Sequence, residues 1–341
     1  MGQGCEGCRH QYRVKMIKKH ILTLYFVASA LALPGVAAAQ IATDNYPTKP
    51  VRIISPFPPG GSVDTVGRLI AARLSESYGQ TFVVDNRAGA SGSIGMEIAA
   101  NAPGDGYTLV VNTLPLVTNQ FLFSKVPYDA LRDFVPVSLL TTTPAIMISH
   151  PSLPAKTVRE LITLTRSRSE GLNYGGAGPG TNPHIAGELF NYLAKTNITI
   201  IQFKGGGPAM IATVSGEISL SIPALPDGLP FVRSGRLRAL GVSSLKRVPQ
   251  LPDVPTIAET VPGYEFTTWQ GLLAPKNTPR AIVTSLSERV KKSLSVAENT
   301  KRFSDGGLDI VASTPEEFAA HLKKEIEKWG KVIRERGMKV E

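Results

Sequence analysis

VRIISPFPPGGSVDTVGRLIAARLSES, residues 51–77, changes its pattern near the middle. The first five residues, Val51–Ser55, are mostly apolar and predict a strand, and the proline–glycine run 56–61 predicts a loop. The residues that follow, from Ser62 to about Ser77, carry apolar side chains at helical spacing. These are Val66, Leu69, Ile70 and Leu74. A strand, a glycine loop and a helix in this order predict the first unit of an open α/β sheet.

The same order of elements continues along the chain. Thr81–Asp85 and Tyr107–Asn112 predict strands, with a short helix, Ser93–Asn101, between them. A similar arrangement restarts after residue 171, which predicts a second sheet. Its expected elements are the strands Leu172–Tyr174, Ile198–Phe203, Ile218–Ile222 and Leu237–Val242 and the helices Pro183–Leu193 and Pro208–Ser215.

Two apolar segments are predicted to connect the two blocks, and two amphipathic helices end the chain. The expected crossovers are Ala145–Ser149 and Thr267–Gly271. The helices Pro279–Ser295 and Pro315–Arg336 are expected to close the first block. The sequence therefore predicts an α/β fold with two domains. Domain 1 comprises residues 40–143 and 272–341, and domain 2 comprises residues 144–271.

The first 39 residues have the pattern of a secretory signal peptide. Basic residues precede the apolar run Ile21–Leu33, and Pro34-Gly35 ends it. The small residues Ala37-Ala38-Ala39 predict cleavage between Ala39 and Gln40. The run of 13 residues is shorter than the roughly 20 that a membrane span needs. Translation from Met16 would leave the same pattern, and a periplasmic location is expected.

The composition of the whole chain changes once this leader is set aside. The 341 residues carry a formal net charge of +10 and two cysteines, Cys5 and Cys8. Both cysteines precede the apolar run, so cleavage would remove them, and neither a redox nor a zinc role is expected. The leader also holds five Lys/Arg and one Glu, which leaves +6 on the mature chain. The remaining basic clusters lie on predicted helix surfaces without interleaved aromatic residues, so nucleic-acid binding is not expected.

Each predicted domain places a glycine-rich loop between the carboxyl end of a strand and the start of a helix. Ligands of open α/β sheets bind at this edge, and the N–H groups of a helix N-terminus favour an anion. The loops do not fit nucleotide-binding motifs. No Gly-Lys-Ser/Thr occurs, and residues 176–181 lack the last glycine of G-x-G-x-x-G. The pattern therefore predicts a site for a small anion.

Residues suited to catalysis are sparse in the mature chain. His150, His184 and His321 form no pair at metal-ligand spacing, and no cysteine remains. We therefore expect no metal, no cofactor and no catalytic residue. A hydrolase that uses Ser62 or Ser91 is an alternative, but no base is evident beside either serine.

Seven motifs occur in order along the mature chain. They are Pro56-Phe57-x-Pro59-Gly60-Gly61-x-x-Asp64, Asn86-Arg87-x-Gly89-Ala90-x-Gly92-x-Ile94-Gly95, Gly104-Asp105-Gly106-Tyr107-Thr108-Leu109, Gly178-x-Gly180-Thr181-x-x-His184, Phe203-Lys204-Gly205-Gly206-Gly207-Pro208-Ala209, Ser234-Gly235-Arg236-Leu237-Arg238-Ala239-Leu240 and Trp269-x-Gly271-x-x-Ala274-Pro275. With them the chain resembles the periplasmic solute-binding receptors of tripartite tricarboxylate transporters, the Bug receptors, from about Tyr46 to Trp329.

The resemblance implies a two-domain type II periplasmic binding protein fold with a ligand cleft between the domains. It also implies a receptor without cofactor or catalysis, which captures a small carboxylate and delivers it to membrane permease subunits; we expect a monomer. Backbone groups and ordered waters of the loops would hold the ligand. The implied ligand-binding residues are Phe57, Pro59, Gly60, Gly61, Ser62, Asp64, Asn112, Thr113, Gly178, Gly180, Thr181, His184, Lys204, Gly205, Gly206, Gly207, Pro208 and Ala209.

Two of these side chains have an equally ordinary structural interpretation. Asp64 falls in the first turn of a predicted helix, where a carboxylate is favourable for the helix dipole alone. His184 falls in the first turn of another predicted helix and either lines the pocket or makes a structural cap contact.

One departure from the resemblance concerns the far end of the ligand. Relatives commonly carry Asp-Asn where this chain has Pro223-Ala224, and Asp where it has Ser219. A less polar pocket is expected there, which favours a dicarboxylate or an aromatic carboxylate over an amino acid. An alternative function on the same fold is a periplasmic ligand-sensing receptor that feeds a membrane sensor kinase.

Overall fold

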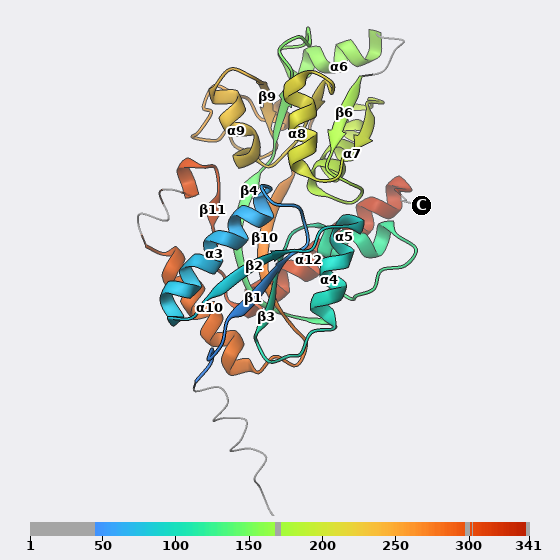
Figure 1. Ribbon diagram of the computed structural model, residues 1–341. Helices are drawn as coiled ribbons and strands as arrows, with labels where there is room; N and C mark the ends of the chain where they lie inside the picture. Colours follow the sequence, from blue (N-terminus) through green and yellow to red (C-terminus); the bar gives the residue numbers. More distant parts are fainter. Residues whose placement is uncertain (1–44, 168–171, 297–300, 302, 339–341) are drawn as a thin grey trace, which may run out of the picture. The chain divides into compact units, whose positions relative to one another are not determined.

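The computed structural model describes residues 45–167, 172–296, 301 and 303–338 (Figure 1). The predicted signal peptide, its cleavage site after Ala39, both cysteines and the alternative start at Met16 lie outside these residues. The chain has two units, Met1–Tyr46 and Pro47–Glu341. The second unit contains two β-sheets with helices packed on them, which confirms the predicted α/β class.

The first sheet has six strands in the order β11-β4-β10-β3-β1-β2. β1 pairs in parallel with β2 and β3, whereas β10 runs antiparallel between β3 and β4. The parallel pairing brings the carboxyl ends of β1, β2 and β3 to one edge, where their loops meet. The strands are β1 (Val51–Ser55), β2 (Phe82–Asn86), β3 (Thr108–Asn112), β4 (Phe134–Pro144), β10 (Thr267–Pro275) and β11 (Asp309–Ile310).

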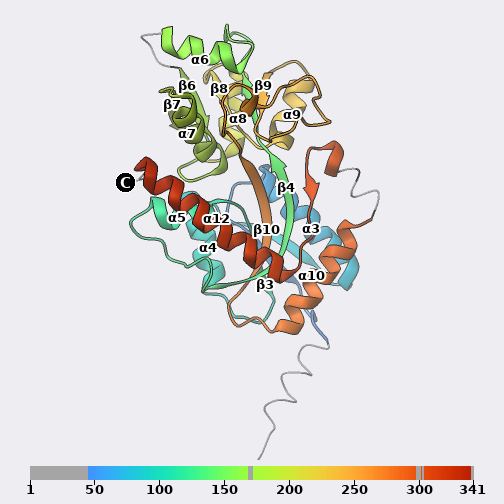
Figure 2. The ribbon, with the colours of Figure 1, turned by 180° about the vertical axis from the view of Figure 1, so that it is seen from behind.

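The first sheet and the helices that belong to it are called the first lobe. Both C-terminal helices pack on it as predicted: α10 contacts α3 and β4, and α12 contacts β4 and α5 (Figure 2). α12 begins at a capping box in which Thr314 and Glu317 exchange hydrogen bonds. The helices are α3 (Ser62–Tyr78), α4 (Ser93–Ala100), α5 (Pro115–Leu122), α10 (Arg280–Leu294) and α12 (Pro315–Arg336), with a short 3₁₀ turn, η2 (Ala90–Gly92), before α4.

The second sheet has five strands in the order β7-β6-β8-β5-β9, and with its helices it forms the second lobe. β6 pairs in parallel with β7 and β8, and β5 runs antiparallel to β8 and β9. The strands are β5 (Ile146–Ser149), β6 (Asn173–Gly176), β7 (Thr199–Gln202), β8 (Leu220–Ser221) and β9 (Arg238–Val242). The helices are α6 (Val158–Ser167), α7 (Asn182–Ala194), α8 (Gly206–Ser215) and α9 (Leu225–Arg233), with the 3₁₀ turn η3 (Ile257–Glu259).

Several helices and strands were not predicted from the sequence, and in two of them prolines weaken the pattern that would indicate a helix or a strand. α9 contains Pro226 in its first turn and Pro230 in its interior, a composition that predicts a turn. β4 contains Pro136, which lies opposite the register shift between Leu272 and Leu273 of β10, where a strand tolerates a residue without N–H. The helices α5 and α6 and the short strand β11 were also absent from the predicted elements.

Ser243 joins the two passages between the lobes. The chain leaves the first sheet at the end of β4 and enters β5 after Ala145, and it returns to β10 after Phe266. The Ser243 N–H donates to the carbonyl oxygen of Ala145, and the Ala145 N–H donates to the Ser243 hydroxyl at 2.7 Å. The Ser243 hydroxyl in turn donates to the Phe266 carbonyl oxygen. The domain boundaries at 143/144 and 271/272 stay a prediction.

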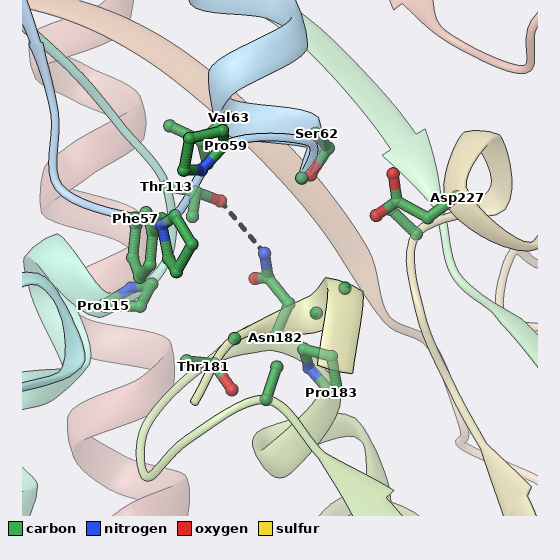
Figure 3. Close-up of a pocket in the computed structure, with 17 residues that line it drawn as sticks. Phe57, Pro59, Ser62, Val63, Thr113, Pro115, Thr181, Asn182, Pro183 and Asp227 are labelled. Carbon is green, nitrogen blue, oxygen red and sulfur yellow. Dashed lines mark hydrogen bonds between the residues drawn. The ribbon is translucent and has the colours of Figure 1, made fainter. Parts of the chain in front are cut away.

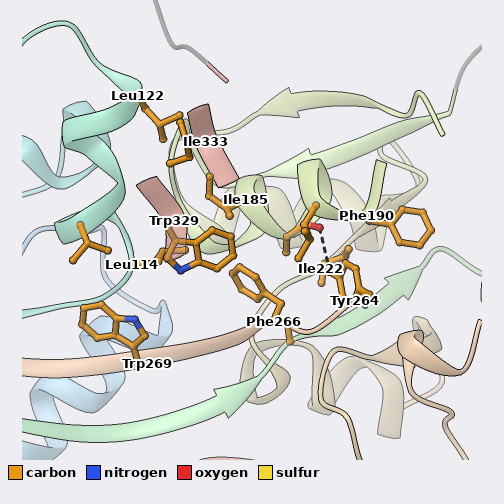
Figure 4. Close-up of a cluster of buried hydrophobic side chains, with 14 of the residues drawn as sticks. Leu114, Leu122, Ile185, Phe190, Ile222, Tyr264, Phe266, Trp269, Trp329 and Ile333 are labelled. Atoms are coloured by element: carbon orange, nitrogen blue, oxygen red, sulfur yellow. Dashed lines mark hydrogen bonds between the residues drawn. The ribbon is translucent and has the colours of Figure 1, made fainter. Parts of the chain in front are cut away.

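A single buried apolar cluster includes side chains of both lobes (Figure 4). Phe266, which precedes β10, packs edge-on against Trp329 of α12, with 5.5 Å between ring centroids. The Nε1–H groups of Trp269 and Trp329 both donate to the Glu325 carboxylate at 3.0 Å. Each indole is 1% exposed, so one carboxylate satisfies two donors that water cannot reach.

Candidate functional site

The candidate site is a cavity of about 80 Å³ where loops of both lobes meet (Figure 3). The first lobe contributes the loop after β1, the start of α3 and the loop after β3. The second lobe contributes the loop after β6 and the starts of α7, α8 and α9. The lining residues are Phe57, Pro58, Pro59, Gly61, Ser62, Val63, Thr113, Pro115, Ala177, Thr181, Asn182, Pro183, Gly205, Gly206, Gly207, Ala224 and Asp227.

Four helix N-termini reach this cavity without a side-chain cap. The N-cap residues are Gly61 of α3, Thr181 of α7, Gly205 of α8 and Ala224 of α9, and none accepts a hydrogen bond from its own helix through a side chain. The start of α9 carries an acidic residue in its first turn, so the other three are the ones suited to an anion. The Thr181 hydroxyl donates instead to the Gly178 carbonyl oxygen at 2.6 Å. First-turn N–H groups with no intrahelical acceptor bind an anion well, and three helix dipoles add to the attraction.

The glycines of the second-lobe loop keep the backbone accessible. Gly206 and Gly207 are exposed, and a Cβ atom at either position would meet no other atom within 4 Å. Gly205 has φ +113°, and a Cβ there would lie 3.1 Å from Pro58 of the first lobe. The open space at positions 206 and 207 is therefore available to a ligand, whereas Gly205 allows the two loops to approach each other.

Asp64 is not part of the cavity wall. Its carboxylate accepts hydrogen bonds from the Gly60 N–H at 3.0 Å, from Asn86 Nδ2 at 2.8 Å and from Arg68 Nε at 3.0 Å. Burial of the carboxyl opposes the charged form, but these hydrogen bonds outweigh it and lower the pKa of Asp64. The residue thus positions the loop after β1.

His184 also acts within its own loop. Its Nδ1 accepts a hydrogen bond from the Gly180 N–H at 2.9 Å, so the imidazole holds the loop that precedes α7. Burial lowers the pKa of His184 to about 4, which keeps the ring neutral and able to accept. The Glu188 carboxylate lies 3.8 Å from Nε2, and burial raises its pKa.

Hydrogen bonds cross between the lobes next to the cavity. Asn182 Nδ2 of α7 donates to Thr113 Oγ1 of the first lobe at 3.1 Å (Figure 3). The Thr118 hydroxyl of α5 donates to the Gly180 carbonyl oxygen, also at 3.1 Å. Asn112 lies beneath this contact, with Oδ1 bonded to the Thr113 N–H. The lobes are therefore in direct contact around the cavity.

Asp227 is the titratable side chain of the cavity wall. It projects from the first turn of α9, and its carboxylate points into the cavity from the side opposite Phe57 and Pro115 (Figure 3). Among the residues that the structure describes, none forms a hydrogen bond or ion pair with this carboxylate. Burial raises the pKa of Asp227 to about 7.

A second cavity of about 600 Å³ adjoins the first, with Phe57, Pro58, Ala177 and Gly205 common to both. Its wall includes Gly178, Lys204 and residues 88–92 of the first lobe. Residues 89–92 all have positive φ, including Ala90 at +46° and Ser91 at +52°, which non-glycine residues adopt at a cost of about 1–3 kcal/mol. This loop therefore holds an unfavourable conformation beside the second cavity.

The predicted ligand-binding residues divide into three groups by position. Nine line the first cavity: Phe57, Pro59, Gly61, Ser62, Thr113, Thr181, Gly205, Gly206 and Gly207. Gly178 and Lys204 line the second cavity. Those that line neither are Gly60, Asp64, Asn112, Gly180, His184, Pro208 and Ala209. Asp227 was not predicted, and it places a carboxylate in the wall beside Ala224, where a less polar pocket was expected.

The described residues contain no group of three or more His, Cys, Asp or Glu side chains placed to hold a metal ion. None of the described helices has the length and apolar character needed to cross a membrane.

Comparison with known proteins gives consistent matches. A family described as "Tripartite tricarboxylate transporter family receptor" matches residues 66–338. Protein BugT of Bordetella pertussis is 35% identical, with 91% of this chain and 96% of BugT covered. An R. palustris protein, Rpa4515 with adipate, is 38% identical with a TM-score of 0.83, covering 86% of this chain and 98% of that one. MatC from Rhodopseudomonas palustris with bound malate is 33% identical with a TM-score of 0.81, covering 84% and 100%.

Proposed function

The chain belongs to the tripartite tricarboxylate transporter receptor family, and from that premise we propose that it captures a small carboxylate between its lobes and delivers it to membrane permease subunits. Members of this family are periplasmic solute-binding proteins with a two-domain fold, and the chain is a receptor of this kind, not an enzyme. The observation that carries the proposal is the meeting, at one cavity, of three uncapped helix N-termini suited to an anion.

Dicarboxylates are the first class to test. Adipate and malate are the ligands named for two solved relatives, and both are dicarboxylates. The expected preference of dicarboxylates and aromatic acids over amino acids rested on a wall of low polarity. The Asp227 carboxylate weakens the argument against amino acids.

The size of the site bears on how the ligand fits. The first cavity, at about 80 Å³, is much smaller than the adjoining one at about 600 Å³. We propose that a ligand of six carbons extends from the first cavity into the second, or that the lobes separate to admit it. We propose hinge closure between the lobes, and X-ray scattering with and without ligand measures it. Superimposable profiles, from an apo protein shown to be open, would refute this proposal.

Thermal unfolding with a ligand panel tests the proposed function. The panel contains adipate, malate, benzoate, aspartate and glutamate. A ligand at 100 times its Kd adds about 2.7 kcal/mol of stability. A domain of 150–250 residues gains about 2–4 °C in Tm for each kcal/mol, so a true ligand raises Tm by several degrees. If no acid shifts Tm and calorimetry finds no binding, the proposal fails.

Gly207 offers a variant that distinguishes the loop from the rest of the molecule. A Cβ atom at position 207 would meet no other atom within 4 Å, so we expect Gly207→Glu and Gly207→Gln to fold normally. Both variants add a side chain at the cavity wall, and the carboxylate of Glu also repels an anion at the start of α8. We expect Gln to weaken carboxylate binding and Glu to weaken it further. Equal binding by both variants and the parent protein would place the ligand elsewhere.

The remaining parts of the proposal concern export and assembly. We propose cleavage between Ala39 and Gln40 and a monomeric mature protein in the periplasm. Intact mass measurement of the exported protein tests both points. A mass that corresponds to another N-terminus, or to a stable dimer under native conditions, would refute the respective point.

A further inference from the structure

Asp227 lies in the cavity wall away from the helix N-termini that are suited to bind the ligand's carboxylate. It is therefore placed to contact the other end of the ligand. The uncapped starts of α3, α7 and α8 attract the ligand's carboxylate. Asp227 approaches the same cavity from α9, and it is the ionisable residue among those that line it. A ligand in this cavity therefore meets positive helix ends at one place and a carboxylate at another.

The Asp227 carboxylate has unused hydrogen-bonding capacity. The described residues provide it with no donor, although a carboxylate accepts several hydrogen bonds. Its position in the first turn of α9 is favourable for the helix dipole, which explains an acidic residue there but not its direction into the cavity. A half-buried carboxylate without a partner is costly, and a ligand that supplies a donor would offset that cost.

From this geometry we propose that Asp227 determines specificity by accepting a hydrogen bond from the ligand, so that the receptor selects small carboxylic acids with a hydroxyl or ammonium group at the far end. This inference rests on the proposed function and refines its ligand class. When Asp227 is ionised, an acid with a bare second carboxylate at that end is disfavoured, because two like charges would share a half-buried site. Within the proposed class of small carboxylates, we therefore expect adipate, the ligand named for one relative, to bind this chain more weakly than an acid with a donor at the far end. Charge-assisted hydrogen bonds are the strong ones, so the discrimination should be large.

Matched four-carbon acids test the proposal. Butyrate, succinate, 4-hydroxybutyrate and 4-aminobutyrate differ only in the far group. Isothermal titration calorimetry on the mature protein at pH 8.5 gives each Kd, because Asp227, whose pKa burial raises to about 7, is then ionised. We expect 4-hydroxybutyrate and 4-aminobutyrate to bind at least tenfold more tightly than butyrate and succinate.

Two substitutions assign the discrimination to the side chain. Asp227→Asn removes the charge and keeps the size, and we expect it to weaken 4-aminobutyrate at least tenfold while it strengthens succinate. Asp227→Leu, which keeps the branched shape but is larger and apolar, should weaken both donor-bearing acids more than it weakens butyrate. Asp253→Asn removes the same charge from an exposed residue that lines neither cavity, and it should change no ratio.

Each outcome has a separate meaning. If acids bind but Asp227→Asn leaves their order unchanged, Asp227 does not contact the ligand and the inference fails. If succinate is the tightest ligand of the parent protein, Asp227 acts as a neutral acid and the inference again fails. If neither these acids nor the earlier panel binds, the proposed function itself fails. A purely structural role for Asp227 would lower every affinity together and could not reverse the order.

Discussion

Acidification should destabilise this protein through His184, which must stay neutral to accept the Gly180 N–H. The side chain is 12% exposed, and burial lowers its pKa from 6.5 to about 4. As the pH falls below 6.5, His184 is protonated in the unfolded chain but stays neutral in the folded protein. Stability is therefore fully present above about pH 6.5 and is lost progressively down to about pH 4.

The size of this loss follows from the two pKa values. One pKa unit corresponds to about 1.4 kcal/mol, so a shift of about 2.5 units gives at most about 3.4 kcal/mol. Linkage gives a loss of about 2 kcal/mol at pH 5 and about 3 kcal/mol at pH 4. The nearby Glu188 would attract a protonated His184 and reduce these values.

The matched variant is His184→Asn. Asparagine Oδ1 occupies nearly the position of imidazole Nδ1, so it can still accept the Gly180 N–H without titrating. Urea unfolding of both proteins between pH 7.5 and pH 4 cancels the contribution of all other groups. We expect the parent protein to lose about 2 kcal/mol more than the variant by pH 5. Parallel pH profiles would show that His184 does not carry the effect and would refute the hydrogen-bond argument.

Two further predictions concern the core. Glu325→Leu leaves both buried indole N–H groups without an acceptor and should lower the free energy of unfolding by about 3 kcal/mol, whereas Glu325→Gln keeps one acceptor and should lower it less. Urea unfolding followed by tryptophan fluorescence measures both variants, and equal stability of all three proteins would contradict the argument that one carboxylate serves both indoles. Gly271→Ala places a Cβ against the buried Phe318 ring and should cost about 1–3 kcal/mol. Gly206→Ala, in open space, is its control, and a smaller cost of Gly271→Ala in a Phe318→Leu background confirms the clash.

Much of the fold could be predicted from local pattern. Val51–Ser55 and the helix from Ser62 were predicted at nearly their observed bounds, because strand, loop and helix each carry a distinct periodicity. α9 was not predicted, because its prolines at 226 and 230 favour a turn, whereas packing keeps the segment helical. Local helix propensity is a weak guide to structure where tertiary contacts determine the conformation of a segment.

The glycine loops of the candidate site were predictable for a similar reason. A glycine run between a strand and a helix lies at the edge of an open α/β sheet where ligands bind, so these loops could be selected from the sequence alone. The roles of Asp64 and His184 depended on hydrogen bonds to Gly60 and Gly180, which sequence spacing does not reveal. Asp227 was missed because nothing in the linear sequence shows that the first turn of α9 faces the cavity.

Ser243 has a mechanical consequence for the whole receptor. Its backbone and hydroxyl join the outgoing segment at Ala145 to the segment that returns after Phe266. The two segments are also paired directly, with Thr267 opposite Pro144 and the Thr268 hydroxyl donating to the Thr143 carbonyl oxygen. In the proposed closure, linkers joined in this way favour rotation of the lobes over sliding, and the loops at the cavity move further than the residues beside Ser243.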